Sequence, residues 1–271
     1  MYQVDAFTDT LFKGNPAAVI VTEQWLAQDL MQNLALENNL SETAFVKVID
    51  AENYEIRWFT PTTEVAFCGH ATLASSFVLF KDFTDAPSIQ FHVKKLGTFV
   101  VSQAEDGKII MNFPIRRAEK IDQYPELLTQ ALSKPIKNVY LNNQAYIVEY
   151  ETPQDVIDEQ PNLEKLKQLG QLSTAITASS AYIDVALTAS ATEYDCVSRY
   201  FAPANGIDED PVTGSIHTAI APLWAEKLAK NQILAYQASA RGGTLYCEIL
   251  ENERIEISGY AKLYMQAQLS L

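Results

Sequence analysis

The sequence is poor in cysteine and in basic residues. Only three of its 271 residues are cysteines, and such an odd, sparse set without a secretory leader favours a reducing cytoplasm over a disulfide framework. Twenty lysines and arginines stand against 34 aspartates and glutamates, which gives a formal net charge of −14. Nucleic acids and anionic membranes bind basic surfaces, so we expect neither as a partner. A small acidic substrate is still compatible with this charge, because local backbone donors can oppose the overall field.

Long apolar runs and nucleotide-binding loops are also missing. No run is long enough to span a bilayer, and residues 1–5 lack the basic and apolar segments of a signal peptide. Neither G-x-G-x-x-G nor G-x-x-x-x-G-K-[ST] occurs, so the sequence gives no support for a dinucleotide or a nucleoside triphosphate. Hydrophobic residues nevertheless make up 48% of the chain, which is ample for a core.

One short pattern occurs twice. Residues 64–74 read EVAFCGHATLA and residues 209–219 read EDPVTGSIHTA. In each, small and polar residues around a central glycine, Gly69 or Gly214, lead into an apolar run that is compatible with a helix. Glycine lets the backbone turn sharply, and the first amide N–H groups of a helix lack partners within it. Two such helix starts predict that an acidic ligand is held by two related halves of the chain.

Hydrophobic periodicity predicts the same kinds of element in both halves. The first half has expected strands at 2–7, 17–21, 40–46 and 54–59, helices at 25–37 and 71–80, and a hairpin of 91–101 with 108–113 that turns at Asp106-Gly107. The second has expected helices at 124–132, 163–169 and 216–229, the last shortened or bent at Pro222, and strands at 139–140, 146–150, 181–187, 194–201, 234–240, 244–250 and 254–258.

The helices at 71–80 and 216–229 have almost no polar face, so protein should surround them. The charged, proline-containing stretch at 114–125 is the expected boundary, with one half at 1–116 and the other at 117–271. We therefore predict an α+β protein of two pseudo-symmetric domains, each a curled mixed sheet around a central apolar helix.

Several side chains near these motifs are candidates for acid–base chemistry. Glu42 lies among apolar neighbours, although its local sequence alone favours a strand-edge residue that faces water. Asp210 precedes the second glycine turn, where Asp-Pro also commonly starts a turn or caps a helix. His70 and His217 each lie beside a glycine motif, and a lone histidine is usually structural. Ser215 could bind an anion or cap the helix.

Cys68 has an alternative role. A thiol at a helix N-terminus has a lowered pKa and could act as a base. A two-thiol racemase would need a second cysteine, but the residue before Gly214 is Thr213. A metal site formed by Cys68, His70 and His217 is not expected, because the Cys-x-His spacing does not match a common zinc pattern.

Seven motifs along the chain resemble the PhzF-like family, whose namesake is the phenazine-biosynthesis isomerase. These motifs occur in family order at 4–8 (VDAFT), 14–19 (GNPAAV), 40–45 (LSETAF), 57–61 (RWFTP), 68–72 (CGHAT), 210–215 (DPVTGS) and 257–259 (ISG). The resemblance implies the diaminopimelate epimerase-like fold, with an active site in the cleft between two pseudo-symmetric halves. It also implies a homodimer and neither a metal nor an organic cofactor.

The resemblance also assigns roles to individual residues. Glu42 matches the catalytic acid/base, and His70 and Asp210 match the other catalytic positions. The expected substrate-binding residues are Asn15, Gly69, Gly214 and Ser215. The resemblance thus implies a cofactor-independent isomerase of a small unsaturated or amino carboxylic acid. A racemase or epimerase that uses Cys68 and a non-catalytic metabolite-binding protein of the same fold are the alternatives.

Overall fold

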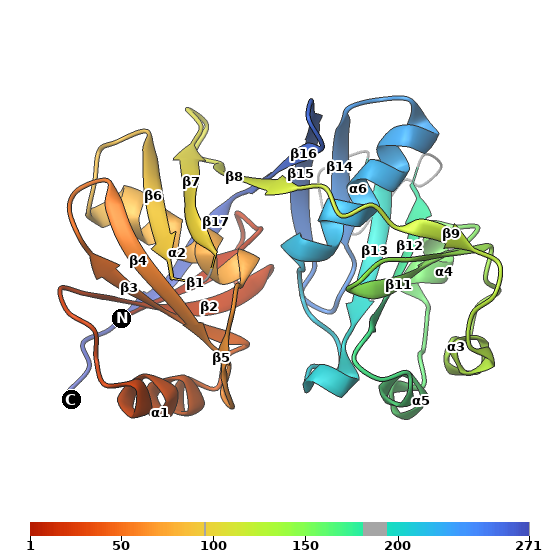
Figure 1. Ribbon diagram of the computed structural model, residues 1–271, viewed down its shortest axis with the longest axis horizontal. Helices are drawn as coiled ribbons and strands as arrows, with labels where there is room; N and C mark the ends of the chain where they lie inside the picture. The colour runs from red at the N-terminus through yellow and green to blue at the C-terminus, as the bar shows by residue number, and fades with distance from the viewer. Residues whose placement is uncertain (95, 181–193, 271) are drawn as a thin grey trace. The chain divides into compact units, whose positions relative to one another are not determined.

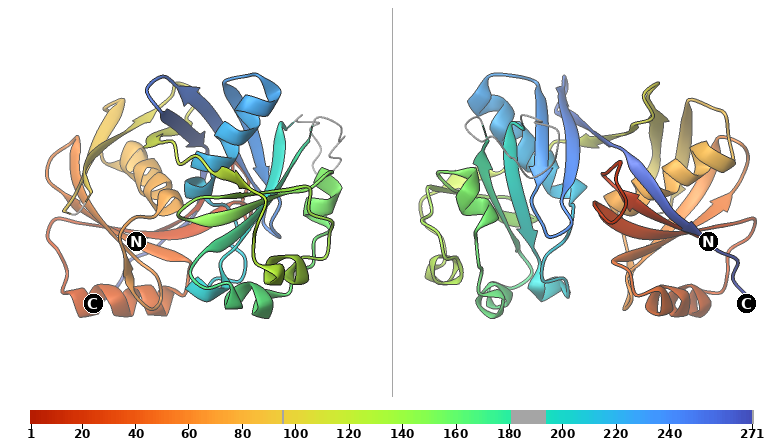
Figure 2. Two further views of the ribbon diagram at one scale, coloured as in Figure 1. Left: turned by 45° about the vertical axis from the view of Figure 1, so that its right-hand side comes forward. Right: turned by 180° about the vertical axis from the view of Figure 1, so that it is seen from behind.

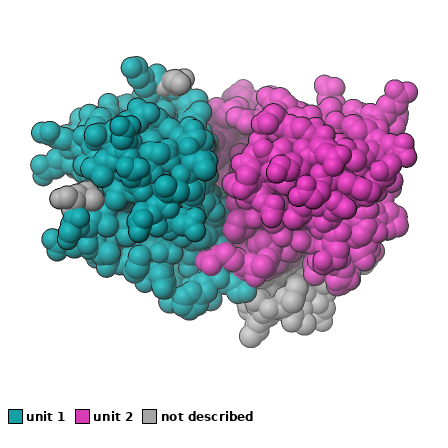
Figure 3. Space-filling view, turned by 90° about the horizontal axis from the view of Figure 1, so that it is seen from below, with its two compact units in different colours: residues 1–112, 258–271 teal, residues 113–257 magenta. Residues whose placement is uncertain are grey.

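The computed structural model describes residues 1–94, 96–180 and 194–270. Contacts divide the chain into two units, one of residues 1–112 and 258–271 and the other of residues 113–257 (Figure 3). The last residues of the chain thus join the first unit, because β17 (Ala261–Gln266) pairs with β1 (Tyr2–Ala6). The strand predicted at 181–187 lies outside the described residues. The domain bounds 1–116 and 117–271 stay a prediction.

Unit 1 is a curled mixed sheet with one helix inside it. Its strands pair in the order β17, β1, β2, β3, β4, β6, β7 and β8, with the two-residue β5 also on β4. After β17 and β1, the elements are β2 (Asn15–Thr22), α1 (Gln28–Asn38), β3 (Glu42–Val48), β4 (Asn53–Phe59), β5 (Glu64–Val65), α2 (Gly69–Asp82), β6 (Ser88–Val93), β7 (Gly97–Gln103) and β8 (Ile109–Pro114). The pairs β2–β3 and β4–β6 are parallel, and the others are antiparallel.

The central helix α2 is buried on almost every side. Nine of its 14 residues are buried, and strands of unit 1 lie in front of it and behind it in the views of Figures 1 and 2. Its buried hydroxyl groups are satisfied within the helix: Thr72 donates to the Cys68 carbonyl at 2.6 Å and Ser75 to the Ala71 carbonyl at 2.7 Å. The helix can therefore fill the core without leaving these polar groups unpaired.

Unit 2 repeats this plan. Its strands pair in the order β9, β10, β11, β12, β13, β14 and β15, and the pairs β11–β12 and β13–β14 are parallel. The elements are β9 (Glu119–Ile121), α3 (Glu126–Ala131), β10 (Asn138–Leu141), β11 (Ala145–Glu149), α4 (Pro153–Ile157), α5 (Leu163–Gln168), β12 (Ser173–Ser179), β13 (Cys196–Phe201), a 3₁₀ turn (Pro203–Asn205), α6 (Gly214–Leu228), β14 (Gln232–Gln237), β15 (Gly243–Leu250) and β16 (Arg254–Gly259).

The two units share one sequence of pairings. From β17 in unit 1 and from β9 in unit 2, the order is antiparallel, antiparallel, parallel, antiparallel, parallel, antiparallel. In both units the second parallel crossover contains the buried helix, α2 or α6. The predicted α+β fold of two pseudo-symmetric halves is confirmed.

Some predicted elements were wrong in detail. The strand expected at 91–101 is two strands, β6 and β7, because the chain turns before Gly97, whose φ of 83° suits glycine. Helix α6 is not shortened at Pro222 but continues to Leu228. Proline cannot donate to the carbonyl of Thr218, and the amide of Arg116 takes that acceptor at 3.1 Å. Strands β5, β9, β12 and β17 and helix α4 were not predicted.

No helix in the described part of the chain is long and apolar enough to cross a membrane.

Candidate active site

Glu42 is buried at the start of β3. Parallel pairing of β3 with β2 places it beside Ala17, and the residue is only 8% exposed. The local expectation of a water-facing Glu42 was therefore wrong. Burying a carboxylate costs free energy unless polar groups accompany it, so its surroundings decide what it can do.

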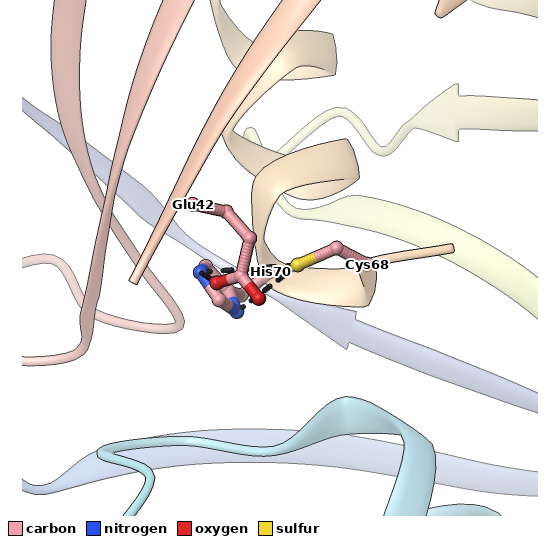
Figure 4. Close-up of side chains that lie close together, drawn as sticks. All are labelled: Glu42, Cys68 and His70. Carbon is pink, nitrogen blue, oxygen red and sulfur yellow. Dashed lines mark hydrogen bonds and ion pairs between the residues drawn. The ribbon is translucent and has the colours of Figure 1, made fainter. Parts of the chain in front are cut away.

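His70 is that polar partner. Helix α2 begins at Gly69, and His70 in its first turn is 5% exposed. Its Nε2 atom lies 3.0 Å from Oε2 of Glu42, an ion pair between two side chains on different elements of unit 1. Figure 4 shows the Glu42 carboxylate and the Cys68 sulfur close to the His70 ring. The first glycine motif thus places an imidazole against the predicted acid/base.

The charge on His70 follows from its neighbours. Burial by itself lowers the pKa of His70, but the facing Cys68 and Glu42 groups outweigh burial and hold the pKa well above the ordinary value. Glu42 is thus the acidic side chain that faces Nε2 of His70.

Asn15 lies on the other side of the His70 ring. It begins β2 and is fully buried, and its Nδ2 atom is 3.1 Å from His70 Nδ1. A carboxamide can present either its nitrogen or its oxygen to the ring, so it suits both protonation states of an imidazole. Asn15 therefore orients the His70 ring by its contact with Nδ1. Its predicted role as a direct substrate-binding residue stays a prediction.

Cys68 differs from the prediction. Its sulfur lies 3.5 Å from Nδ1 and 3.9 Å from Nε2 of His70. Burial, and then the charge of Glu42, raise the pKa of the Cys68 thiol to about 11, despite opposing contributions from His70 and the Ala71 amide. The expectation that the helix N-terminus lowers this pKa was wrong, because desolvation outweighs the helix dipole here. Near neutral pH Cys68 is a thiol and a poor base.

These three side chains are also potential metal ligands. One donor atom each from Glu42, Cys68 and His70 lie within 4.8 Å of one another. The set differs from the Cys68, His70 and His217 group considered from the sequence. Both ring nitrogens of His217 are engaged elsewhere, with the Thr213 carbonyl at 2.8 Å and the Ser198 hydroxyl at 3.2 Å.

The second glycine motif starts α6 in unit 2. Asp210 is 9% exposed, and its carboxylate accepts a hydrogen bond from the Thr213 hydroxyl. Gln237 braces the turn, since its Nε2 donates to the Asp210 carbonyl at 2.7 Å and its Oε1 accepts from the Thr213 amide at 2.8 Å. Gly214 then opens the helix. Asp210 is thus held in a rigid turn immediately before the helix.

Ser215 follows Gly214 in the first turn of α6. The Nε2 atom of Gln144 donates to the Ser215 hydroxyl oxygen at 2.8 Å, which leaves the hydroxyl hydrogen available for another acceptor. His217 is fully buried, and burial lowers its pKa to about 4, so it is neutral near pH 7. It is a structural residue of the helix start, as a lone histidine usually is.

The repeated topology shows which positions correspond. Ala17 opposes Glu42 in unit 1, and Ala145 opposes Ser173 in the matching parallel pair of unit 2. In the same way Thr213 matches Cys68, and Ser215 matches His70. Unit 1 therefore contributes a carboxylate and an imidazole, whereas neutral hydroxyl groups occupy the matching positions of unit 2.

Two neighbours of the candidate residues could not be found in the sequence. Gln144 and Gln237 carry no motif and reach Ser215 and Asp210 only through the fold. Gln144 lies in the turn between β10 and β11, and Gln237 ends β14. Their partners lie 71 and 27 residues away in the chain, so no local pattern reveals them.

Comparisons with known proteins show the family to which the chain belongs. Residues 4–267 match the family model described as phenazine biosynthesis-like protein. A Pseudomonas aeruginosa protein named uncharacterized isomerase is 41% identical over 270 residues, which covers 100% of this chain and 98% of that protein. An Enterococcus faecalis crystal structure of the phenazine biosynthesis protein PhzF family has a TM-score of 0.90 at 39% identity, covering 100% of this chain and 98% of that chain. A predicted epimerase from Pseudomonas aeruginosa, at 19% identity and a TM-score of 0.70, covers 99% of this chain and 98% of that chain and is similar in fold. The chain therefore belongs to the phenazine biosynthesis-like PhzC–PhzF family.

Proposed function

We propose that this protein is a cofactor-independent isomerase of a small unsaturated or amino carboxylic acid, with Glu42 as the acid/base. The observation that carries this proposal is the buried ion pair of Glu42 and His70 at 3.0 Å. Isomerase is also the activity that the name of the Pseudomonas aeruginosa relative gives to that protein.

In the proposed reaction Glu42 moves one proton. Its carboxylate takes a proton from one carbon of the substrate, and the resulting carboxylic acid returns a proton to another carbon. His70 holds the carboxylate in place from the α2 side and supplies positive charge while negative charge builds on the substrate. Asp210 is proposed as a further catalytic residue, on the family resemblance of its motif.

The glycine motifs at the starts of α2 and α6 are proposed as the sites that bind the substrate carboxylate. The amides at the starts of α2 and α6, around Gly69 and Gly214, point along helix axes whose dipoles favour an anion. The Ser215 hydroxyl adds a donor, because Gln144 already donates to its oxygen. Fixed donors of this kind stabilise an enolate-like intermediate without reorganising.

The asymmetry of the two units favours a single base. A two-base racemase needs a proton acceptor from each half of its fold. Here Ser173 matches Glu42 and Thr213 matches Cys68, and neither hydroxyl is a base near neutral pH. The high pKa of the Cys68 thiol, about 11, also weakens the Cys-dependent alternative.

The test is solvent exchange in deuterated water. A panel of unsaturated, amino and hydroxy carboxylic acids is incubated with the protein, and mass spectrometry reads deuterium uptake at substrate carbons. Glu42→Gln should lower the exchange rate by at least about 10²–10⁴-fold, the usual contribution of a general base. Cys68→Ser should retain measurable exchange.

Two results would overturn the proposal. Loss of exchange in Cys68→Ser with retention in Glu42→Gln would support the Cys-dependent racemase. Tight binding of an acid with no exchange at any carbon would support the metabolite-binding alternative. Circular dichroism of both variants distinguishes a lost base from a lost fold.

A further inference from the structure

We propose that Glu42, Cys68 and His70 form a binding site for one Zn²⁺ ion, which acts as a reversible inhibitor and not as a resident cofactor. Their donor atoms lie within 4.8 Å of one another. A carboxylate oxygen, an imidazole nitrogen and a thiolate sulfur are the three ligand types that zinc takes in proteins. Hard cations such as Mg²⁺ prefer oxygen ligands and should not use this set.

The separations are close to those of tetrahedral zinc. Usual Zn–ligand bond lengths with tetrahedral angles place nitrogen and sulfur ligands about 3.6 Å apart, and nitrogen and oxygen ligands about 3.4 Å apart. The corresponding distances from His70 Nε2 are 3.9 Å to Cys68 Sγ and 3.0 Å to Glu42 Oε2. The third pair, Glu42 and Cys68, lies within 4.8 Å, and the Cys68 sulfur is nearer to Nδ1, at 3.5 Å. Completing three ligands of a tetrahedral site would therefore take side-chain shifts of up to about 1 Å, with the sulfur turned toward Nε2.

The surroundings of the three side chains also suit an ion. The Glu42 and His70 side chains are only 11% and 6% exposed, and the Glu42 Oε2 atom is buried without a hydrogen-bond partner among the described residues, so it has a lone pair to offer to an ion. Binding releases the thiol proton of Cys68 and the Nε2 proton of His70 to solvent. A dication with one carboxylate and one thiolate is then electrically neutral in a buried place, which avoids the cost of an isolated charge.

Asn15 would hold the His70 ring in the orientation that zinc binding needs. An imidazole that binds zinc through Nε2 keeps its proton on Nδ1, where Asn15 lies 3.1 Å away. The carboxamide can turn its oxygen to that N–H group. Inhibition rests on the proposed function, because zinc would occupy the oxygen and nitrogen atoms that the reaction uses. Binding of zinc does not rest on it.

The experiment is calorimetric titration of ZnCl₂ into the metal-free protein under reducing conditions. We expect one saturable event with one ion per chain. Cys68→Ser and Glu42→Gln should each weaken binding by at least about 100-fold, beyond the 10–100-fold typical of losing an outer contact. His92→Gln, which changes an imidazole outside this cluster, is the matched control and should leave the affinity unchanged. MgCl₂ should give no binding event.

Cobalt gives a second readout that needs no activity. CoCl₂ added to the parent protein should produce thiolate-to-cobalt charge-transfer absorption, which Cys68→Ser should lose. Cys247 is a buried cysteine of β15 outside the cluster, and Cys247→Ser should keep the absorption. No saturable zinc binding by the parent, zinc binding that survives in both Cys68→Ser and Glu42→Gln, or zinc binding removed by His92→Gln would each overturn the site. Zinc binding without any exchange activity would refute only the proposed isomerase.

Discussion

The buried neutral His217 makes a quantitative prediction about acid stability. His217 is the fourth residue after Thr213, the N-cap residue of α6. Its two ring nitrogens contact the Thr213 carbonyl and the Ser198 hydroxyl. Burial lowers its pKa from 6.5 to about 4. The folded state therefore excludes a proton that the unfolded chain binds below pH 6.5. Stability is fully present above pH 6.5 and is lost as pH falls toward 4.

The magnitude follows from the two pKa values. Each unit between them is about 1.4 kcal/mol, so the loss from this residue between pH 7 and pH 4 is about 3 kcal/mol. Urea unfolding of the parent and of His217→Gln at several pH values measures it. Other titrating groups are common to both proteins, so the difference between the two free energies of unfolding isolates this one residue.

The difference in free energy of unfolding between the parent and His217→Gln should fall steadily as the pH is lowered. Glutamine does not titrate and can still donate to the Thr213 carbonyl, so the parent should lose its advantage steadily below pH 6.5. His92→Gln is the control for the exchange of a histidine for a glutamine elsewhere in the fold, since the His92 ring contacts Thr98 and Asn53 in unit 1. A parent-minus-variant difference that is flat from pH 7 to pH 4 would refute the reasoning.

Three further predictions concern the glycine turn of unit 1 and the polar residues of the site. Gly14→Ala should lower the free energy of unfolding by several kcal/mol in urea melts, because the φ of Gly14 is 66° and an added Cβ would lie 2.1 Å from the Ala6 carbonyl oxygen. Gly107 also has a positive φ but has open space around it. The control Gly107→Ala should therefore lower the free energy of unfolding by only about 1 kcal/mol. Asn15→Leu should cost about 1–3 kcal/mol by removing the partner of His70, and it should lower the exchange rate, whereas unchanged rate and stability would contradict the orienting role. In Asp210→Asn the side chain can still accept a hydrogen bond from the Thr213 hydroxyl, so the melting temperature should stay near that of the parent. The rate of deuterium exchange at the substrate should fall, and an unchanged rate would remove Asp210 from the proposed mechanism.

The parts of the fold that composition dictates could be predicted from the sequence. Helices α2 and α6 have so few polar residues that only a buried position suits them, and both are buried. The break between β6 and β7 was missed because apolar residues continue on both sides of a short turn, which only two lysines at 94–95 and Gly97 mark in the sequence. The continuation of α6 past Pro222 depends on the Arg116 amide, which is remote in sequence, so no local rule reveals it.

The candidate site could likewise be predicted only in part from the sequence. Its residue types were visible in the motifs, but the burial of Glu42 depends on the pairing of β3 with β2 and on the approach of α2. The pKa of Cys68 was predicted in the wrong direction, since the helix start is apparent from the sequence whereas desolvation is not. The homodimer, the cytoplasmic location and the small-metabolite partner stay predictions.

The matching positions of the two units bear on the proposed mechanism, in which one carboxylate moves the proton. Enzymes that invert a centre with two bases need a proton donor and a proton acceptor on opposite faces of the substrate. Glu42 in unit 1 is matched by Ser173 in unit 2, so these two positions supply one carboxylate and not two. In the proposed mechanism, the serine and threonine hydroxyls of unit 2 would stabilise charge by hydrogen bonds and would not exchange protons with carbon.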